Sequence, residues 1–155
     1  MSPTRTPTQR SPITVLYDPA TGEPVVEGMR YDPIEDGAYR LDRYHLVESP
    51  EWNVRYHHIM TSDPSDLHDH PWDYVTTLLA GAYVEVTPLG SMLYRAPCTL
   101  VRRAEDAHRL ELPEGPVWSL LVTGPVRRPW GFHTEAGWVP WHKHGQRTPA
   151  ATRAW

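Results

Sequence analysis

Short apolar runs, each broken by proline or glycine, dominate the hydrophobic pattern of this chain. Runs rich in Val, Leu, Thr, Tyr and Trp predict strands, which are Ile13–Tyr17, Glu51–Met60, Tyr74–Leu79, Ala82–Thr87, Met92–Tyr94, Thr99–Arg102, Ala107–Leu112 and Val117–Thr123, with two further candidates at Pro129–Phe132 and Trp138–Trp141. Long amphipathic helical patterns are missing, and we expect one short helix at most, over Asp36–Leu46. Evenly spaced short strands are typical of an all-β sandwich or barrel.

The two ends of the chain differ in composition from its centre. Residues 1–12 consist largely of Pro, Ser, Thr, Arg and Gln, which predicts a disordered leader, and residues 142–155 are expected to form a flexible tail. The 155 residues suit one domain, which we place at residues 13–141.

Charge and cysteine content exclude several classes of protein. The net charge of −4 and the lack of a basic run argue against a nucleic-acid partner. Cys98 is the only cysteine, so the chain has neither an internal disulfide framework nor a cysteine-built zinc site. No apolar run approaches the roughly 18 residues of a membrane span, and residues 1–12 lack an apolar signal core. We therefore expect a cytoplasmic protein with no membrane partner.

Two histidines stand two residues apart in the segment Leu67–Trp72. Residues i and i+2 of an extended chain point to the same face, so His68 and His70 can hold one ion. Neutral imidazole is the commonest protein ligand for transition metals, and His108 offers a third ring on a later predicted strand. Three protein ligands with open positions are typical of a catalytic metal site rather than a structural one.

The order of these residues resembles the cupin superfamily, whose members are small jelly-roll barrels. The first cupin motif contains an H-x-H pair, a glutamate and a closing glycine; His68 and His70 match the pair, and Gly81 stands at the closing position. The second motif supplies a histidine on a later strand, which His108 fits. The resemblance covers residues 53–123. It implies a cupin-type jelly-roll with a metal pocket that opens at one end to a small-molecule substrate, and it makes a homodimer the expected assembly.

The chain departs from the motif where cupins usually carry the glutamate ligand. Tyr74 occupies that position, and Ser62 replaces the opening glycine. Tyr74 either packs in the barrel or serves as a hydrogen-bond donor or acid beside the metal. Asp73 is the alternative ligand, but neighbouring strand residues face opposite ways, so only one of the two can point inward. Asp69, between the two ligands, should face away and cap the turn.

The predicted strand Glu51–Met60 offers two further candidates for substrate contact. Trp52, Val54, Tyr56, His58 and Met60 share the more apolar face, which is favoured for the core. Asn53, Arg55, His57 and Ile59 share the other face, which carries a cation and suits a polar pocket. His58 and Arg55 are therefore candidate catalytic residues beside Tyr74, and a purely structural role is the alternative. The tryptophans at 130, 138 and 141 either roof a ligand pocket or serve in packing or assembly.

A three-histidine site resembles the thiol dioxygenase branch of the cupins, which implies ferrous iron and dioxygen. We therefore favour a non-haem iron oxygenase that binds one divalent transition metal, with Fe(II) preferred and Zn, Ni, Mn or Cu as alternatives. The alternative functions are a non-redox metallocupin of the isomerase or lyase type, and a metal-containing binding module without turnover.

Overall fold

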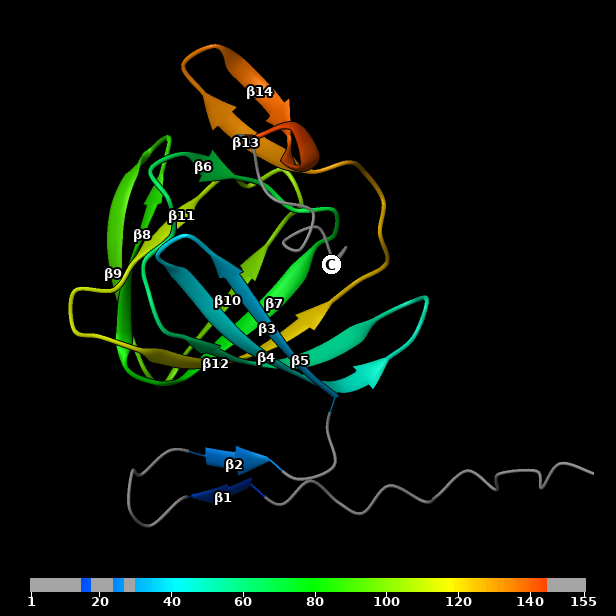
Figure 1. Ribbon diagram of the computed structural model, residues 1–155, viewed down its shortest axis with the longest axis vertical. Helices are drawn as coiled ribbons and strands as arrows, with labels where there is room; N and C mark the ends of the chain where they lie inside the picture. Colours follow the sequence, from blue (N-terminus) through cyan, green and yellow to red (C-terminus); the bar gives the residue numbers. More distant parts are fainter. Residues whose placement is uncertain (1–14, 18–23, 27–29, 145–155) are drawn as a thin grey trace, which may run out of the picture.

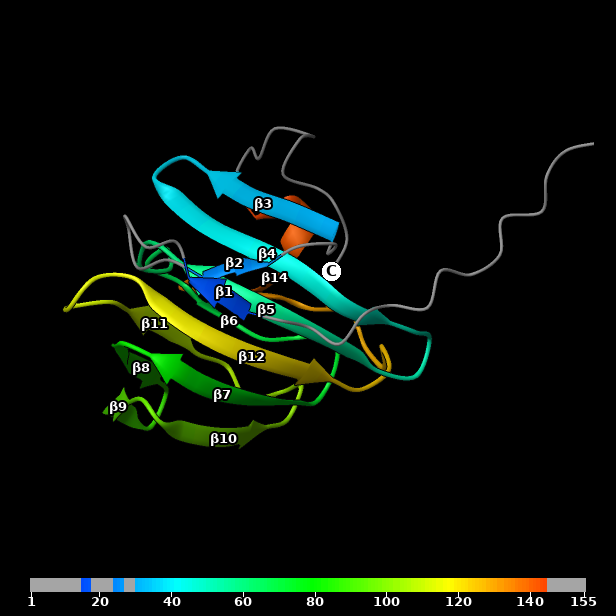
Figure 2. The same cartoon turned by 90° about the horizontal axis from the view of Figure 1, so that it is seen from below.

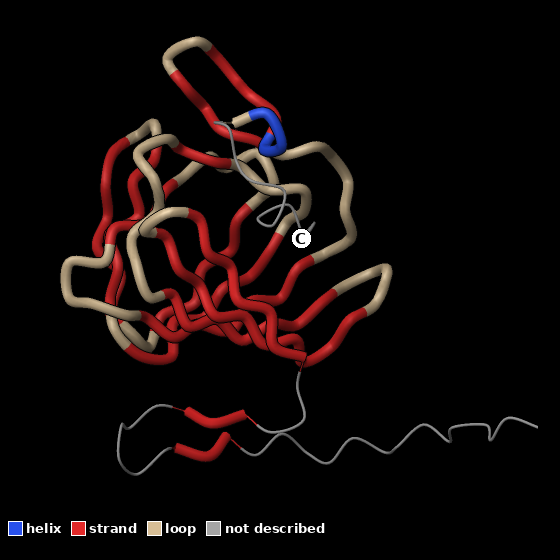
Figure 3. Tube along the Cα trace, viewed as in Figure 1, coloured by secondary structure: helices blue, strands red, loops and turns tan. Residues whose placement is uncertain are grey.

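The computed structural model describes residues 15–17, 24–26 and 30–144, and almost all of this part of the chain is strand or turn (Figures 1 and 3). The all-β, jelly-roll prediction is therefore confirmed. The predicted leader at residues 1–12 and most of the predicted tail lie outside the described residues. Within them, no helix has the length and apolar character needed to cross a membrane.

One six-stranded antiparallel sheet carries most of the core. Its spatial order is β10-β7-β12-β5-β4-β3. The strands are β3 (Arg30–Asp36), β4 (Tyr39–Glu48), β5 (Asn53–Ile59), β7 (Tyr74–Ala80), β10 (Cys98–Arg102) and β12 (Val117–Thr123). Because β12 lies between β7 and β5, late and early parts of the sequence share one sheet, as a jelly-roll requires.

Two three-stranded sheets complete the barrel (Figure 2). One contains β11 (Arg109–Glu111), β8 (Ala82–Thr87) and β9 (Gly90–Arg95); the other contains β14 (Gly137–Pro140), β13 (Gly131–Thr134) and β6 (Leu67–His68). A single 3-10 turn, Trp141–Lys143, follows β14, and a separate two-stranded ribbon pairs β1 (Val15–Tyr17) with β2 (Pro24–Val26).

The helix expected over Asp36–Leu46 is wrong. This segment forms the turn of the β3–β4 hairpin and most of β4, and Gly37 turns the chain with a φ of 61°. Leu41, Arg43 and His45 alternate with residues that point to the other face, a period of two that fits a strand. The buried cation and imidazole concealed this period, because hydrophobicity alone marks only Leu41 as a core position.

Gly81 joins β7 to β8 at a point where a side chain cannot fit. Its φ is 85°, and a Cβ atom there would lie 2.8 Å from the carbonyl oxygen of Pro116. The turn directs β8 against Leu78 and Val117, which are fully buried with Tyr83 in the main apolar cluster. The glycine of the motif thus makes the tight turn between β7 and β8.

Candidate metal centre

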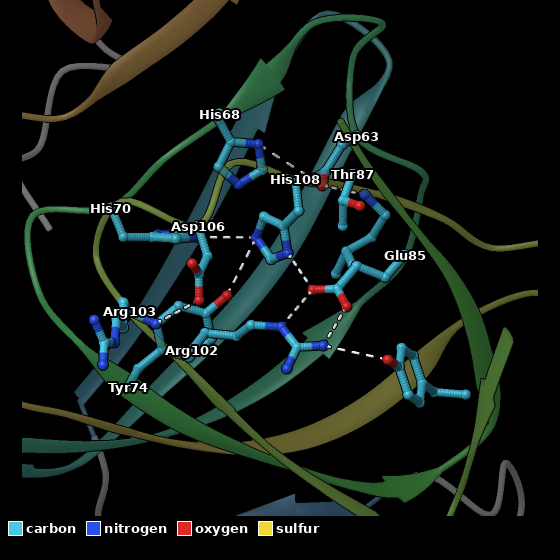
Figure 4. Close-up of polar contacts among 12 residues, drawn as sticks. Asp63, His68, His70, Tyr74, Glu85, Thr87, Arg102, Arg103, Asp106 and His108 are labelled. Carbon is cyan, nitrogen blue, oxygen red and sulfur yellow. Dashed lines mark hydrogen bonds and ion pairs between the residues drawn. The ribbon is translucent and has the colours of Figure 1, made fainter. Parts of the chain in front are cut away.

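The structure brings the three predicted histidines together although 40 positions separate the first from the last (Figure 4). The ring centroids of His68, His70 and His108 are 5.0–5.1 Å apart in each pair. Their candidate ligand atoms all lie within 4.8 Å of one another, and Nε2 of His70 is 2.9 Å from Nε2 of His108. The three imidazoles converge on one point, as the ligands of a single ion would.

Backbone hydrogen bonds fix the segments that carry these rings. The amide of His68 donates to the carbonyl of His108 at 2.8 Å, and the reverse bond is 2.9 Å long. The amide of His70 donates to the carbonyl of Ala104 at 2.9 Å. The peptide ladder therefore sets the spacing of the three rings before any ligand binds.

Glu85 on β8 orients the third imidazole. Nδ1 of His108 lies 2.8 Å from Oε1 of Glu85, and the same buried carboxylate forms an ion pair with Arg102. Burial raises the pKa of Glu85, but the hydrogen bonds and charges of His108 and Arg102 outweigh it and lower this pKa to about 2. An ionised carboxylate accepts only, so Nδ1 of His108 carries the proton and Nε2 presents its lone pair to the centre.

Tyr74, not Asp73, points toward the histidines. The Tyr74 hydroxyl lies 3.3 Å from Nε2 of His108, and burial raises its pKa well above the usual 10, so the phenol stays protonated. The Asp73 carboxylate instead accepts from the amide of Ala104 at 2.7 Å and pairs with Arg127 at the same distance. The alternative in which Asp73 completes the metal sphere is therefore wrong, because strand alternation turns its side chain outward.

His57 on β5 faces the histidines, whereas His58 does not. A cavity of about 80 Å³ reaches all three histidines, and His57, Ser119 and Tyr83 line it. His58 lies on the opposite face of the sheet, with its ring stacked 3.9 Å from that of Trp118. The face of β5 that carries His57 and Ile59 therefore lines the cavity. The more apolar face is also buried, and there Tyr56 and His58 pack against Trp118.

The tautomer of His57 follows from its neighbour. Nε of Arg43 donates to Nε2 of His57 at 3.2 Å, so the ring proton is on Nδ1. Burial lowers the pKa of His57 well below 6.5, as do the charges of Arg43 and Arg55. His57 is thus a neutral hydrogen-bond donor in the cavity wall. The sequence signal for His57 as a cavity residue was the presence of the cation Arg55 on the same face of the strand.

Arg55, the other candidate on β5, lies on the same inner face as His57 and is 4% exposed. Arg55 does not line the cavity, but Trp72 does, and Cζ of Arg55 lies 5.7 Å from the centroid of the Trp72 ring. Trp72 in turn stacks on His70 with 4.9 Å between ring centroids. One indole therefore connects the guanidinium of Arg55 with the histidine cluster.

The aromatic residues near the end of the chain pack together beside His68. Trp130 stacks on Trp141 at 5.8 Å, and Phe132 lies 6.0 Å from the ring of His68. Trp138 donates its indole N–H to Asp69 at 2.9 Å. These tryptophans pack around β13, and none of them lines the cavity described above. They therefore serve in packing rather than as the roof of that cavity.

Solved structures of similar fold agree with this architecture. A cupin 2 conserved barrel domain protein from Rhodopseudomonas palustris superposes with a TM-score of 0.65 at 15% identity, over 82% of this chain and 89% of that one. A cupin-2 domain protein from Rhodospirillum rubrum gives a TM-score of 0.60 at 15% identity, over 72% and 79% of the two chains. The polyketide cyclase RemF from Streptomyces resistomycificus gives 0.56 at 13% identity, over 66% and 78%.

Neither a protein-family model nor a curated protein matches the sequence. The comparisons therefore establish the fold: the chain has the cupin fold, a double-stranded β-helix, as its histidine spacing indicated. Together with the histidine cluster they support a cupin whose three histidines can hold a metal.

Proposed function

We propose that this protein is a metal-dependent enzyme that acts on a small molecule, with His68, His70 and His108 as the protein ligands of one divalent transition metal. The observation that carries the proposal is the approach of two Nε2 atoms to 2.9 Å. Glu85 fixes the lone pair of His108 toward His70, so a proton or a cation has to lie between the two rings. A single hydrogen bond would not require a third imidazole and a phenol at the same point, whereas a metal site does.

Ferrous iron is the favoured metal, and oxygenation the favoured reaction. Among the described residues, the group that could hold a metal consists of three imidazoles and no carboxylate. Such a set of ligands is compatible with Fe(II). Bound iron would supply dioxygen activation and redox chemistry at the open positions. Zinc, nickel, manganese and copper are the alternatives that the test below compares.

The chain's own residues supply orientation and protons around those positions. The protonated hydroxyl of Tyr74 can donate a hydrogen bond, or a proton, to a substrate oxygen beside His108. His57, a neutral ring with its proton on Nδ1, lines the same cavity. The apolar lining contributed by Leu41, Ile59, Leu110 and Leu121 limits the access of water to the site.

A non-redox reaction is the second candidate, and one comparison favours it. RemF, which shares the fold at a TM-score of 0.56, is named as a polyketide cyclase. A Lewis-acid metal with Tyr74 as the proton donor would serve isomerisation, hydration or elimination without dioxygen.

Reconstitution with different metals tests the two candidates. The metal-free protein is loaded anaerobically with Fe(II) or Zn(II), and dioxygen uptake and product formation are followed with a panel of small molecules. The oxygenase proposal expects uptake coupled to product with iron only. Product formation with zinc and without dioxygen would select the non-redox reaction, and tight ligand binding with no product under either metal would identify a binding module.

A further inference from the structure

A second group of polar side chains lies inside the barrel next to the histidines, and its hydrogen-bonding capacity is unused. Nε and Nη1 of Arg55, Nε1 of Trp72 and Oγ1 of Thr123 are buried and have no hydrogen-bond partner among the residues that the structure describes. All three residues are less than a twentieth exposed. Buried polar atoms are nearly always satisfied, so several such atoms at one place indicate a missing partner.

The strand register places these side chains together. Arg55 on β5 is opposite Leu121 on β12, so Thr123, two residues further along β12, lies diagonally across on the same face. His45 on β4 is directly opposite Arg55 on the other side. Trp72 lies against the guanidinium of Arg55, with its ring centroid 5.7 Å from Cζ.

The unused atoms are donors. Guanidinium and indole nitrogens can only donate, and a threonine hydroxyl can do so. Nδ1 of His45 lies 3.0 Å from Nη2 of Arg30 and 3.2 Å from Oε1 of Glu48. Nε2 of His45 lies 3.6 Å from Asp32 and makes no hydrogen bond within the described part of the chain. A concentration of donors without acceptors calls for a ligand rich in acceptors.

The charges around Arg55 indicate that this ligand is an anion. Among the described residues, no carboxylate lies within 4.0 Å of the Arg55 guanidinium. The two carboxylates that act on it from a distance are Asp32 and Glu48, and both already contact Arg30 and His45. A buried cation without a counter-ion is costly, so it favours binding of an anion.

We infer that Arg55, with Trp72, Thr123 and His45, forms a binding site for the carboxylate group of a small organic acid. If the proposed function holds, this acid is the substrate, and its anionic end is held beside the metal with Trp72 as the shared wall. A carboxylate fits better than a phosphate dianion for two reasons. The planar fork of one guanidinium matches two carboxylate oxygens, and the neighbouring cation, Arg43, already bonds His57 and lies 4.0 Å from Asp32.

Acid and amide pairs test the charge requirement on the unaltered protein. The metal-loaded and metal-free proteins are titrated with acetate, propionate and benzoate, with the matched amides and with inorganic phosphate, by calorimetry and NMR. We expect at least one carboxylate to bind at least about tenfold more tightly than its amide, with or without metal. Amides that bind as well as the acids, or no binding by any carboxylate, would overturn the inference, and so would preferential binding of phosphate.

Variants of Arg55 test the residue. Arg55→Met keeps the length of the side chain and removes the charge, so carboxylate binding should be lost while the metal content stays that of the wild type. Because the substitution removes a buried cation without a counter-ion, the unliganded variant should melt no lower than the wild type. A purely structural arginine would predict the opposite shift. Arg95→Met, which breaks only the exposed pair with Glu114, is the matched control and should leave binding unchanged.

Two measurements keep the outcome separate from that of the proposed function. If Arg55→Met does not fold, Arg55→Lys retains the charge without the planar fork and should still weaken carboxylate binding. Carboxylate binding as tight as that of the wild type in either folded variant would contradict the inference. Metal content is measured independently. If the protein binds metal but no carboxylate, only the carboxylate site is refuted. If it binds carboxylate but no metal, only the proposed function is refuted.

Discussion

At the scale of single residues, a buried carboxylate orients His108, the third proposed metal ligand. Glu85 accepts from Nδ1 of His108 and is itself held by Arg102, so the ring is fixed in orientation and in tautomer. Carboxylate partners of this kind raise the basicity of a ligating imidazole and reduce its freedom to rotate. The proposed metal site therefore depends on a residue that is not a ligand.

Glu85→Gln should weaken metal binding without abolishing the fold. The amide can still accept from His108, but the charge is lost and Arg102 is left without its partner. We expect the dissociation constant for the metal to rise by about 10- to 100-fold, measured by competition with a chromogenic chelator. Glu114→Gln, at an exposed ion pair, is the control. Unchanged metal affinity in Glu85→Gln would show that the carboxylate has no influence on the site.

Tyr74→Phe should separate metal binding from turnover. The substitution removes only the hydroxyl that lies 3.3 Å from His108, so the metal content should stay at the wild-type level. Loss of a general acid slows the reaction by about 10²- to 10⁴-fold, which steady-state kinetics on the identified substrate would detect. Wild-type rates in this variant would return Tyr74 to a packing role.

Much of the site could be predicted from residue spacing alone. The i, i+2 histidine pair and the opposite directions of Asp73 and Tyr74 follow from strand alternation, and the structure shows both. The roles of His57 and Glu85 could not be predicted in this way. Apolar content does not show which buried face of β5 lines the cavity, and the contact between Glu85 and His108 depends on the pairing of β8 with β11, which no local pattern encodes.

At the scale of elements, Asp69 attaches the β13–β14 hairpin to the barrel. It is 1% exposed, it accepts from the amide of Gly131 at 2.7 Å and from the indole of Trp138 at 2.9 Å, and it pairs with Arg128 at 3.1 Å. The sequence predicted that Asp69 faces away from the two histidines beside it, and the structure turns its carboxylate toward β13 and β14. It does not cap a local turn but binds a hairpin more than 60 residues later.

Asp69→Ala should destabilise the protein strongly although Asp69 is not a ligand. The substitution leaves the buried amide of Gly131 without its acceptor and Arg128 without its ion-pair partner, which costs about 3–5 kcal/mol in the free energy of unfolding. Urea denaturation of the metal-free protein measures this loss. Asp66→Ala, which breaks a more exposed pair with His144, should cost much less. Equal losses in the two variants would contradict this role for Asp69.

Element prediction succeeded where short apolar runs stand between glycine or proline breaks. The strands β7, β8 and β12 are runs of this kind, and they were predicted within a few residues of their bounds. The β3–β4 hairpin was missed because Arg43 and His45 occupy inward positions. A strand whose buried face carries charge has no hydrophobic period to detect, and that face is the one we assign to ligand binding.

At the scale of the whole molecule, the barrel keeps several titratable groups buried in their neutral form. Burial lowers the pKa of His57 and of His70 well below 6.5. The unfolded chain therefore takes up protons below pH 6.5 that the folded chain does not. By linkage, stability is fully present above that pH and falls as the pH is lowered.

The metal-free protein should accordingly lose stability between about pH 7 and pH 5. Urea midpoints across this interval, where neither Glu85 nor Asp63 titrates in the unfolded chain, measure the effect. His57→Gln should flatten the profile, because the glutamine does not titrate. A wild-type midpoint that stays constant from pH 7 to pH 5 would contradict the assignment of these histidines as neutral and buried.

Elemental analysis of the purified protein tests the central claim most directly. Inductively coupled plasma mass spectrometry should find about one divalent transition metal ion per folded wild-type chain, and close to none in His70→Ala or His108→Ala variants whose circular dichroism is unchanged. A full equivalent of metal retained by either folded variant would contradict the account, as would wild-type protein that takes up no metal after exposure to Fe(II), Zn(II), Ni(II), Mn(II) and Cu(II).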